Sequence, residues 1–311
     1  MKLESLSMDS YTSFLLKGPW GFGKTIAAAS FARVGPVHLS YWDKKGPIEL
    51  VQFFKKNAPE LLKNIEYEVY GSHNAGEYLD HLYRLQKDCR YAAVITDSVT
   101  TMTSSSVNWS LSDRNKKAAS KANTSKMTTV DKITPDWGEY KVETSLVSQA
   151  LDICRTLPCH VIWIAHPIPG TKVEGSGSGM RVTKVNSIVT YGSKVAGIVP
   201  GQFSEIYQFS KRSDWNATEG ASRSTYLVST EAIGDDYAKS NIGLSCEMDI
   251  TNKLFYDVWL EEVAKLEAKL TGGTQKQPSI PPAVSSPFAH IPTAKPTAES
   301  NQPTDKKPWQ V

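Results

Sequence analysis

The sequence has few cysteines, no long apolar run and no strong excess of charge of either sign. Its four cysteines form no CxxC pair and have no metal-ligand spacing with the six histidines, so we expect free thiols in a reducing compartment and no zinc site. A stretch of about 18 apolar residues is also missing, and the first ten residues are polar, which predicts neither a membrane span nor a leader. We therefore expect a soluble, cytoplasmic protein without membrane contact.

The net charge of +3 does not by itself indicate a nucleic-acid partner, although it can conceal local basic patches. The 311 residues suit one large domain or two small ones. From Gly272 onward, 40 residues contain eight of the 17 prolines, and such a segment buries too little apolar surface to offset its ordering entropy. We predict a folded domain over 1–270 and a disordered tail over 271–311, which is either inert or a docking arm that uses Phe288 or the terminal KKPWQV.

Upstream of the tail, short apolar runs alternate with helical patterns. Expected strands such as SFLL, VHLSYW, AAVIT and HVIWIA are interleaved with amphipathic segments such as PIELVQFFKK and AGEYLDHLYRLQKDC. Because parallel strands need crossover helices, this alternation predicts an α/β fold with a mostly parallel central sheet flanked by helices. SEIYQFS and STYLVST are expected as antiparallel strands at the sheet edge, and 255–270 as a closing helix.

Two segments interrupt this rhythm. Residues 103–135 are rich in Ser, Thr and Lys, and residues 167–186 are rich in Gly. We expect both to be long loops, which in a compact domain are usually functional or disordered. Each could also be an ordinary solvated surface loop.

The octapeptide GPWGFGKT at 18–25 fits the P-loop pattern GxxxxGK(S/T). In this pattern the glycines let backbone N–H groups point at phosphates, Lys24 reaches the terminal phosphates, and the Thr25 hydroxyl binds Mg²⁺. The following helix adds its N-terminal partial positive charge. We therefore predict ATP or GTP binding with Mg²⁺, at the following residues: Gly18, Pro19, Trp20, Gly21, Phe22, Gly23, Lys24, Thr25 and Ile26. The presence of Trp20 inside the loop has no explanation from the sequence.

A P-loop requires a second acid at the end of another strand, where it holds the magnesium ion. AAVITDS provides it, because the apolar run ends at Asp97. The next residue is Ser98 rather than the Glu that polarises water in many AAA+ motors. The catalytic base must then come from elsewhere. Asp43, after VHLSYW, is our candidate, and His166, after VIWIA, either senses the γ-phosphate or only ends its strand.

Together GPWGFGKT, Asp43, VITDS, DWGEY and VIWIAH resemble the RecA-like core ATPases of phages over about residues 12–250. More narrowly, they resemble the AAA-domain ATPases of the Sak-type single-strand annealing group. The resemblance implies a RecA-like P-loop NTPase fold, binding of single-stranded DNA, and rings or filaments with ATP between subunits. It also implies a catalytic acid at Asp43, a polar switch residue at His166 and, by a short match, a trans-acting Lys239. For a phage protein, the compartment is the host cytoplasm.

Single-strand binders combine cationic side chains with aromatic faces on which bases stack. The two interrupting segments contain such residues, so we expect the following as DNA contacts: Trp109, Arg114, Lys116, Lys117, Lys172, Arg181 and Lys184. The leading hypothesis is a DNA-stimulated ATPase of phage recombination, annealing or replication. The alternatives are a nucleotide-switched loader that touches a single-strand-binding or replication protein through its tail, with little turnover, and a helicase or packaging motor.

Overall fold

The computed structural model describes residues 11–43, 47–120, 133–174, 181–216, 221–231, 238–244 and 246–270. The tail predicted over 271–311 lies outside the described residues. The strands are β1 Ser13–Lys17, β2 Val37–Tyr41, β3 Ile65–Val69, β4 Ala93–Asp97, β5 His160–Ala165, β6 Pro167–Glu174, β7 Arg181–Ile188, β8 Glu205–Asn216, β9 Ala221–Ser229, β10 Lys239–Ser240 and β11 Glu247–Asp249. The α-helices are α1 Lys24–Ala29, α2 Ile48–Asn57, α3 Ala75–Lys87, α4 Val99–Ser120, α6 Trp137–Cys154, α7 Ser193–Ile198 and α8 Phe255–Leu270. Short 3₁₀ helices are η2 Ser30–Arg33, η3 Pro59–Asn64 and η6 Val199–Gln202.

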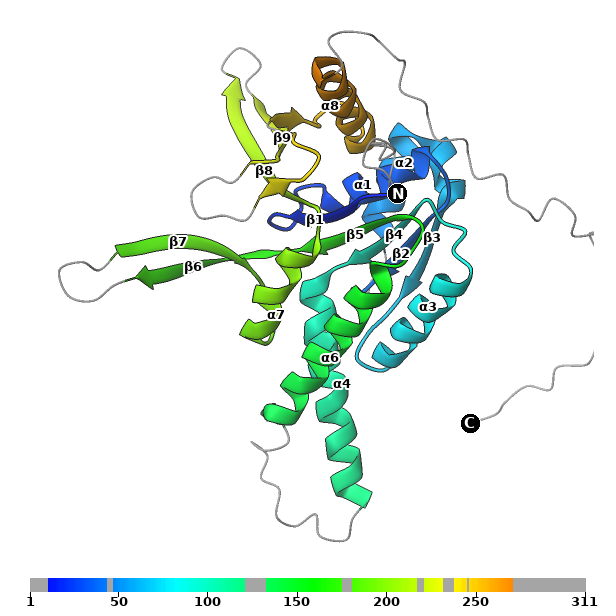
Figure 1. Cartoon of the computed structure of the whole chain (residues 1–311), viewed down its shortest axis with the longest axis vertical. Helices are drawn as coiled ribbons and strands as arrows, with labels where there is room; N and C mark the ends of the chain where they lie inside the picture. Colours follow the sequence, from blue (N-terminus) through cyan, green and yellow to red (C-terminus); the bar gives the residue numbers. More distant parts are fainter. Residues whose placement is uncertain are drawn as a thin grey trace, which may run out of the picture.

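One central sheet organises the fold, with the strand order β11-β9-β8-β1-β5-β4-β2-β3 and β10 paired to β8 (Figure 1). The six strands from β8 to β3 are parallel to their neighbours, and β9, β10 and β11 are antiparallel. The α/β class with a mostly parallel sheet flanked by helices is thereby confirmed. β8 and β9 pair antiparallel as expected for SEIYQFS and STYLVST, but β8 does not lie at the sheet edge, because it also pairs parallel with β1.

Alternation along the strands separates two cores, one on each face of the sheet. On β1, Phe14 and Leu16 pack with α1, α2 and α8, whereas Leu15 packs with the side chains of α3, α4 and α6. Side chains two residues apart point to the same face of a strand, so an apolar run fills both cores. β3, which the sequence analysis did not predict, is half-exposed and carries glutamates, since it lies at the edge of the sheet among the described strands.

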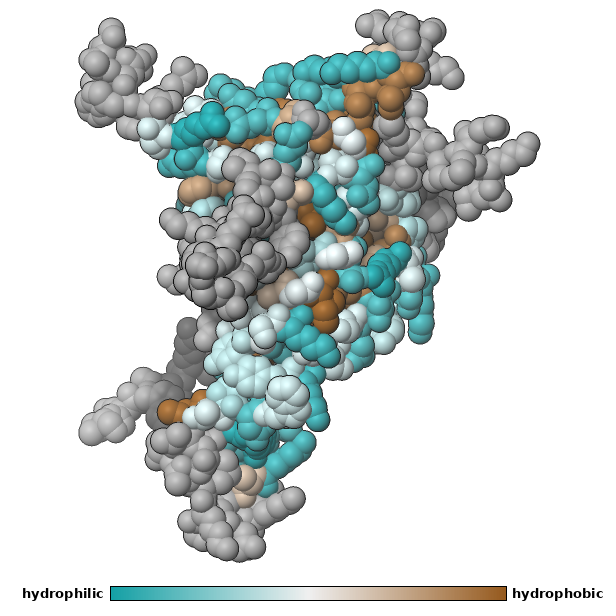
Figure 2. Space-filling model, turned by 60° about the vertical axis from the view of Figure 1, so that its left-hand side comes forward, coloured by the Kyte–Doolittle hydropathy of each residue, from teal (hydrophilic) through white to brown (hydrophobic). Residues whose placement is uncertain are grey.

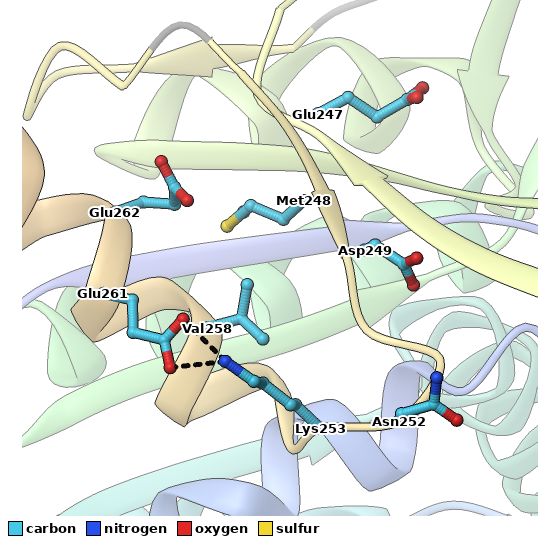
Figure 3. A pocket seen from close by; sticks show the side chains of 8 residues that line it. All are labelled: Glu247, Met248, Asp249, Asn252, Lys253, Val258, Glu261 and Glu262. Atoms are coloured by element: carbon cyan, nitrogen blue, oxygen red, sulfur yellow. Dashed lines mark hydrogen bonds and ion pairs between the residues drawn. The ribbon is translucent and has the colours of Figure 1, made fainter.

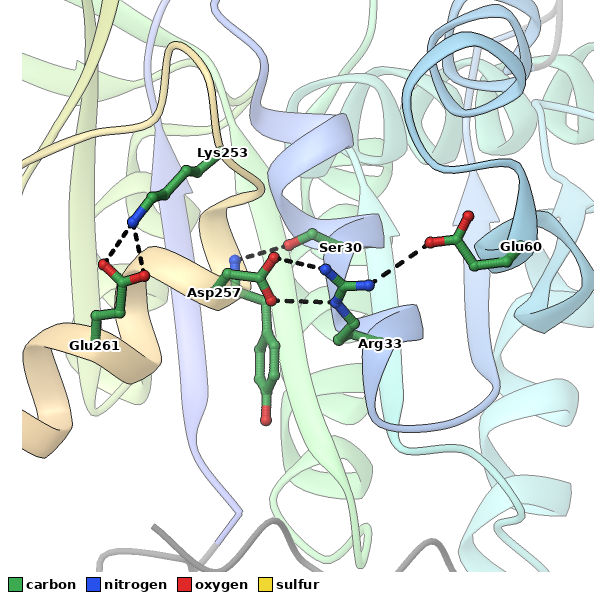
Figure 4. A network of polar contacts seen from close by, with 7 residues as sticks. Ser30, Arg33, Glu60, Lys253, Asp257 and Glu261 are labelled. Atoms are coloured by element: carbon green, nitrogen blue, oxygen red, sulfur yellow. Dashed lines mark hydrogen bonds and ion pairs between the residues drawn. The ribbon is translucent and has the colours of Figure 1, made fainter. Parts of the chain in front are cut away.

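Helix α8 is held against the segment that follows the P-loop (Figure 4). Arg33 of η2 donates two hydrogen bonds to Asp257 at 3.2 and 3.0 Å and lies 3.6 Å from Glu60. The buried Ser30 hydroxyl accepts the Tyr256 N–H at 3.0 Å. Charged groups at this exposure contribute little, about 0–1 kcal/mol each, so the apolar packing of Phe255 and Trp259 provides most of the attachment.

The prediction of loops was wrong for residues 103–120, 167–174 and 181–186, because the structure forms a helix and two strands there. Residues 103–120 belong to the long helix α4, and 167–186 contain the hairpin β6–β7, which extends away from the sheet (Figure 1). In α4 the hydroxyls of Thr103 and Ser106 donate to carbonyls three residues earlier, at 3.0 and 2.7 Å, so these polar side chains are satisfied within the helix. Residues 121–132 and 175–180 are not described.

Arg114, one of the expected DNA contacts, lies beside acidic groups at the start of α6. It lies 2.7 Å from Asp136 and 3.1 Å from Glu139, and it donates to the Thr134 carbonyl at 2.9 Å. Asp136 and Glu139 form the capping box that begins α6. Arg114 therefore joins α4 to the start of α6, where its guanidinium group pairs with two carboxylates.

On the side shown in Figure 2, the described hydrophobic residues form small, separate areas rather than one large apolar face. Such scattered exposure is normal for a folded protein. Among the described helices, none combines the length and the apolar content that crossing a bilayer would require.

Candidate phosphate and magnesium site

The P-loop connects β1 to α1, as its pattern predicts. Gly23 precedes the helix with a φ of 82°, in the left-handed region that glycine adopts without strain. Gly18 leaves β1 against the neighbouring strand β8, and a Cβ at this position would lie 2.7 Å from the Cβ of Phe209. Both glycines are therefore required by the backbone path, one by its φ and one by the close approach.

Lys24 and Thr25 point into the site from the first turn of α1. The buried Lys24 ammonium donates to the Gly18 and Pro19 carbonyls at 2.6 and 2.7 Å. Burial lowers the pKa of Lys24 to about 8, against the opposing attraction of Asp97. A group held in this way meets the added negative charge of a phosphate with little loss of hydration, because it is already buried.

Asp97 ends β4, and its Oδ2 accepts a hydrogen bond from Thr25 Oγ1 at 2.5 Å. The two strand ends are separated by β5, which lies between β1 and β4 in the sheet. Burial raises the pKa of Asp97 to about 6, which the Thr25 hydrogen bond and the Lys24 charge partly oppose. A hydroxyl and a carboxylate oxygen at contact distance are the hard ligands that Mg²⁺ prefers, so these two residues fit the predicted ion.

His166 follows β5 and therefore lies between the P-loop and Asp97. It is buried, and its Nδ1 has no hydrogen-bond partner among the described residues. Burial, followed by repulsion from Lys24, lowers the pKa of His166 to about 4. The imidazole is thus neutral at pH 7 and can hydrogen-bond to a phosphate oxygen without carrying a charge.

Trp20 now has a physical explanation. Its ring is largely exposed and stacks on His166, with centroids 4.6 Å apart and planes inclined by 23°. Aromatic pairs of this geometry contribute roughly 0.5–1.5 kcal/mol beyond the area that they bury. Trp20 therefore covers the imidazole and links the P-loop to the end of β5, from which the β6–β7 hairpin begins.

The P-loop opens into a pocket of about 1110 Å³, large enough for a nucleotide. Asp43 lines it with an exposed side chain, close enough to Asp97 to raise the pKa of that carboxyl. Glu49 of α2 is a second exposed carboxylate in the pocket that the sequence analysis did not select. Ser98, the residue after Asp97, exchanges hydrogen bonds with Thr101.

Sequence reasoning missed the opposite wall of the pocket. This wall is lined by Tyr226 of β9, by the segment 250–254 and by Phe255, the first residue of α8, as well as by residues of α2. No motif marks these residues, since the antiparallel strands β9 and β11 bring them to the P-loop only in the folded sheet. An apolar and polar wall of this kind is where a base and sugar could be held.

A smaller hollow of about 310 Å³ adjoins this wall (Figure 3). Its lining is mainly acidic, and its one cation, Lys253, is paired with Glu261 at 2.7 Å. Like charges would repel a phosphate here, so the hollow does not compete with the P-loop as a nucleotide site.

Lys239 lies away from the P-loop of its own chain. It belongs to β10, where it pairs with Ile206 of β8, and Ile206 is opposite Leu15 in the middle of β1. Lys239 does not line the pocket into which the P-loop opens. The role of Lys239 across a subunit boundary stays a prediction.

The expected DNA contacts fall on two separate elements. Trp109, Lys116 and Lys117 are exposed on α4, with Lys117 paired to Asp113 at 2.6 Å. Lys172, Arg181 and Lys184 are opposite Thr183, Glu174 and Thr171 in the hairpin register, and the structure does not describe their side chains. The structure does not bring these two groups into one site.

Comparisons with known proteins give a fold-level likeness alone. No protein-family model matches the chain, and no curated protein matches it. Among solved structures, a KaiC-like protein from the hyperthermophilic archaeon Pyrococcus horikoshii OT3 is similar over 76% of this chain and 84% of that chain, with 14% identity and a TM-score of 0.38. A likeness at this level carries no argument about activity, so the function has to be inferred from the residues of the site.

Trp20 offers a direct probe of nucleotide entry. We expect ADP with Mg²⁺ to change the tryptophan fluorescence of the wild-type protein, because the nucleotide enters the pocket that the stacked Trp20–His166 pair borders. In Trp20→Phe most of this change should vanish while nucleotide binding persists. Trp137→Phe, which removes a ring that is 75% exposed on α6, is the control and should keep the change. An undiminished response in Trp20→Phe would place the nucleotide elsewhere.

Proposed function

We propose that the protein is a P-loop ATPase that binds ATP with Mg²⁺ and hydrolyses it. The observation that carries the proposal is the meeting of Lys24, Thr25 and Asp97 in one large pocket at the carboxyl edge of the parallel sheet. Ligands of open α/β sheets bind at this edge. The Thr25–Asp97 contact joins residues 72 positions apart in the chain, which a chance glycine-rich turn would not produce.

Each residue has a distinct part in this reaction. Lys24 would bind the terminal phosphates, and Thr25 and Asp97 would hold Mg²⁺, which neutralises the charge that develops on the phosphates. Asp43 would orient the attacking water from the end of β2, with Glu49 as the other carboxylate in reach of the pocket. His166 would accept or donate a hydrogen bond at the γ-phosphate and so report which nucleotide is bound.

We further propose that single-stranded DNA controls this ATPase. Support comes from the position of the β6–β7 hairpin, which begins at the residue after His166 and contains Lys172, Arg181 and Lys184. A change in the hydrogen bonding of His166 would act directly on the first residue of the hairpin. The RecA-like resemblance leads us to propose assembly into rings or filaments and a role in phage recombination, annealing or replication.

A nucleotide-switched loader remains the second candidate. It is supported by Ser98, because the acid that activates water in many AAA+ motors is missing directly after Asp97. In that case ATP binding would drive assembly or partner binding, with little turnover. The two candidates differ in one measurable quantity, which is ATP turnover with and without single-stranded DNA.

The catalytic assignments predict two different losses. Lys24→Ala should weaken ATP binding and lower turnover by roughly 100-fold or more, because it removes the charge that faces the phosphates. Asp43→Asn should keep ATP binding and lower turnover by about 100-fold, the usual size of a general-base effect. Phosphate release and nucleotide titration measure the two quantities, with Glu49→Gln as the matched carboxylate control. Retained turnover in Asp43→Asn together with loss in Glu49→Gln would transfer the role to Glu49.

The DNA proposal predicts a salt-dependent affinity for oligonucleotides. Each phosphate contact of a single strand contributes a slope of about −0.7 to log K against log salt. Replacing Lys172 and Lys184 together by Ala should make the slope shallower by about 1.4, whereas Lys269→Ala on α8 should leave it unchanged. Fluorescence anisotropy of a labelled oligonucleotide measures these slopes. A wild-type affinity that does not depend on salt would remove the electrostatic part of the proposal.

A further inference from the structure

Two histidines and a glutamate meet at the edge of the sheet, away from the P-loop. His38 lies on β2, Glu68 on the edge strand β3 and His81 on α3. Ser40 is opposite Glu68 in the parallel register, and His38 is two residues from Ser40 on β2. His38 and Glu68 therefore lie on the same face of the sheet, and α3, which carries His81, covers this face. One ligand atom from each of His38, Glu68 and His81 lies within 4.8 Å of the other two.

The imidazoles of this cluster lack the hydrogen bonds that buried polar groups normally make. Only 4% of His38 is exposed, and neither of its ring nitrogens has a partner among the described residues. The same holds for His81 Nε2. Most buried side-chain nitrogens in folded proteins have a partner in the protein or in ordered water. Three orphaned nitrogens in one cluster therefore require a specific explanation.

The chemistry of the cluster matches a cation that accepts imidazole electron pairs. His38 is buried and His81 is mostly buried, and a neutral imidazole ring has a free electron pair on one of its nitrogens. The Glu68 carboxylate is partly exposed and brings negative charge, and its Oε2 accepts a hydrogen bond from the Tyr70 hydroxyl at 2.6 Å. A second partner of this kind orients a ligating carboxylate and is typical of metal sites.

We propose that His38, Glu68 and His81 bind a zinc-like transition-metal ion, with water completing the coordination. Imidazole nitrogen and carboxylate oxygen are ligands that Zn²⁺ takes readily, whereas Mg²⁺ prefers oxygen alone. Tetrahedral Zn²⁺ with bonds of about 2.0–2.1 Å keeps its ligands roughly 3.4 Å apart. The three ligand atoms would therefore draw together, which side-chain rotation of the partly exposed Glu68 and His81 permits.

Such an ion would act on the structure rather than on ATP. It would join α3 to β2 and to β3, which pairs with a single strand among those that the structure describes. His38 lies on β2, and Asp43 follows two residues after the end of this strand, so the ion would stiffen the strand that precedes the proposed catalytic acid. The competing explanation is simple packing of the two neutral rings, which stack at 4.2 Å with Tyr91 beside His38 at 5.3 Å.

The test uses the full chain, prepared without a polyhistidine tag and stripped with EDTA. Titration with ZnCl₂ in a calorimeter should show one ion bound per chain, and Mg²⁺ at the same concentration should not compete. Co²⁺ should give the visible absorption bands of a four-coordinate site without a thiolate charge-transfer band. Zn²⁺ should also raise the melting temperature, since it binds the folded state selectively.

Variants assign the ligands. His81→Asn and Glu68→Gln should each weaken Zn²⁺ binding by at least about tenfold, and circular dichroism verifies that both variants are folded. His73→Asn, which changes an exposed histidine in the turn before α3, is the control and should bind like the wild type. The proposal is overturned if the wild type binds no stoichiometric Zn²⁺, if both variants bind as tightly as the wild type, or if Co²⁺ reports thiolate ligands such as Cys89 and Cys159.

Discussion

The hydrogen bond from Thr25 to Asp97 is the interaction on which the whole site depends. It connects the helix after β1 to the end of β4, across the intervening strand β5. The parallel register aligns these ends, with Asp97 opposite Ile164 and Lys17 opposite Ala165. Because β5 lies between β1 and β4, the residue that follows it, His166, is placed beside both Lys24 and the proposed magnesium ligands.

This arrangement suggests how ligand binding in the P-loop pocket can be linked to the β6–β7 hairpin. Trp20 covers the buried imidazole of His166, and the next residue begins the β6–β7 hairpin. A ligand that changes the hydrogen bonding of His166 therefore acts on an element that extends away from the sheet. On the opposite side of the pocket, residues 250–254 precede α8, which packs through its apolar residues against the segment after α1 and pairs there with Arg33 through Asp257. The pocket is thus bordered by elements from both ends of the described chain.

The sequence was sufficient for the parts of the fold and the site that depend on local pattern. The P-loop, the strand ending in Asp97 and the α/β alternation each follow from a few neighbouring residues. It failed at 103–120, where a high content of Ser, Thr and Lys indicated a loop although the hydroxyls are satisfied inside α4. The wall around Tyr226, the Trp20–His166 stack and the His38–Glu68–His81 cluster depend on contacts between distant segments, which no local spacing records.

The most direct test of the central claim is the effect of Mg²⁺ on ATP affinity. If Thr25 and Asp97 hold the ion, Mg²⁺ should strengthen ATP binding to the wild type, and most of this gain should be lost in Thr25→Ala and Asp97→Asn. Thr25→Ser keeps the hydroxyl and should preserve the gain. Isothermal titration with and without Mg²⁺ measures it for each protein. An equal gain in the wild type, Thr25→Ala and Asp97→Asn would contradict the account, because the ion would then be bound without these two residues.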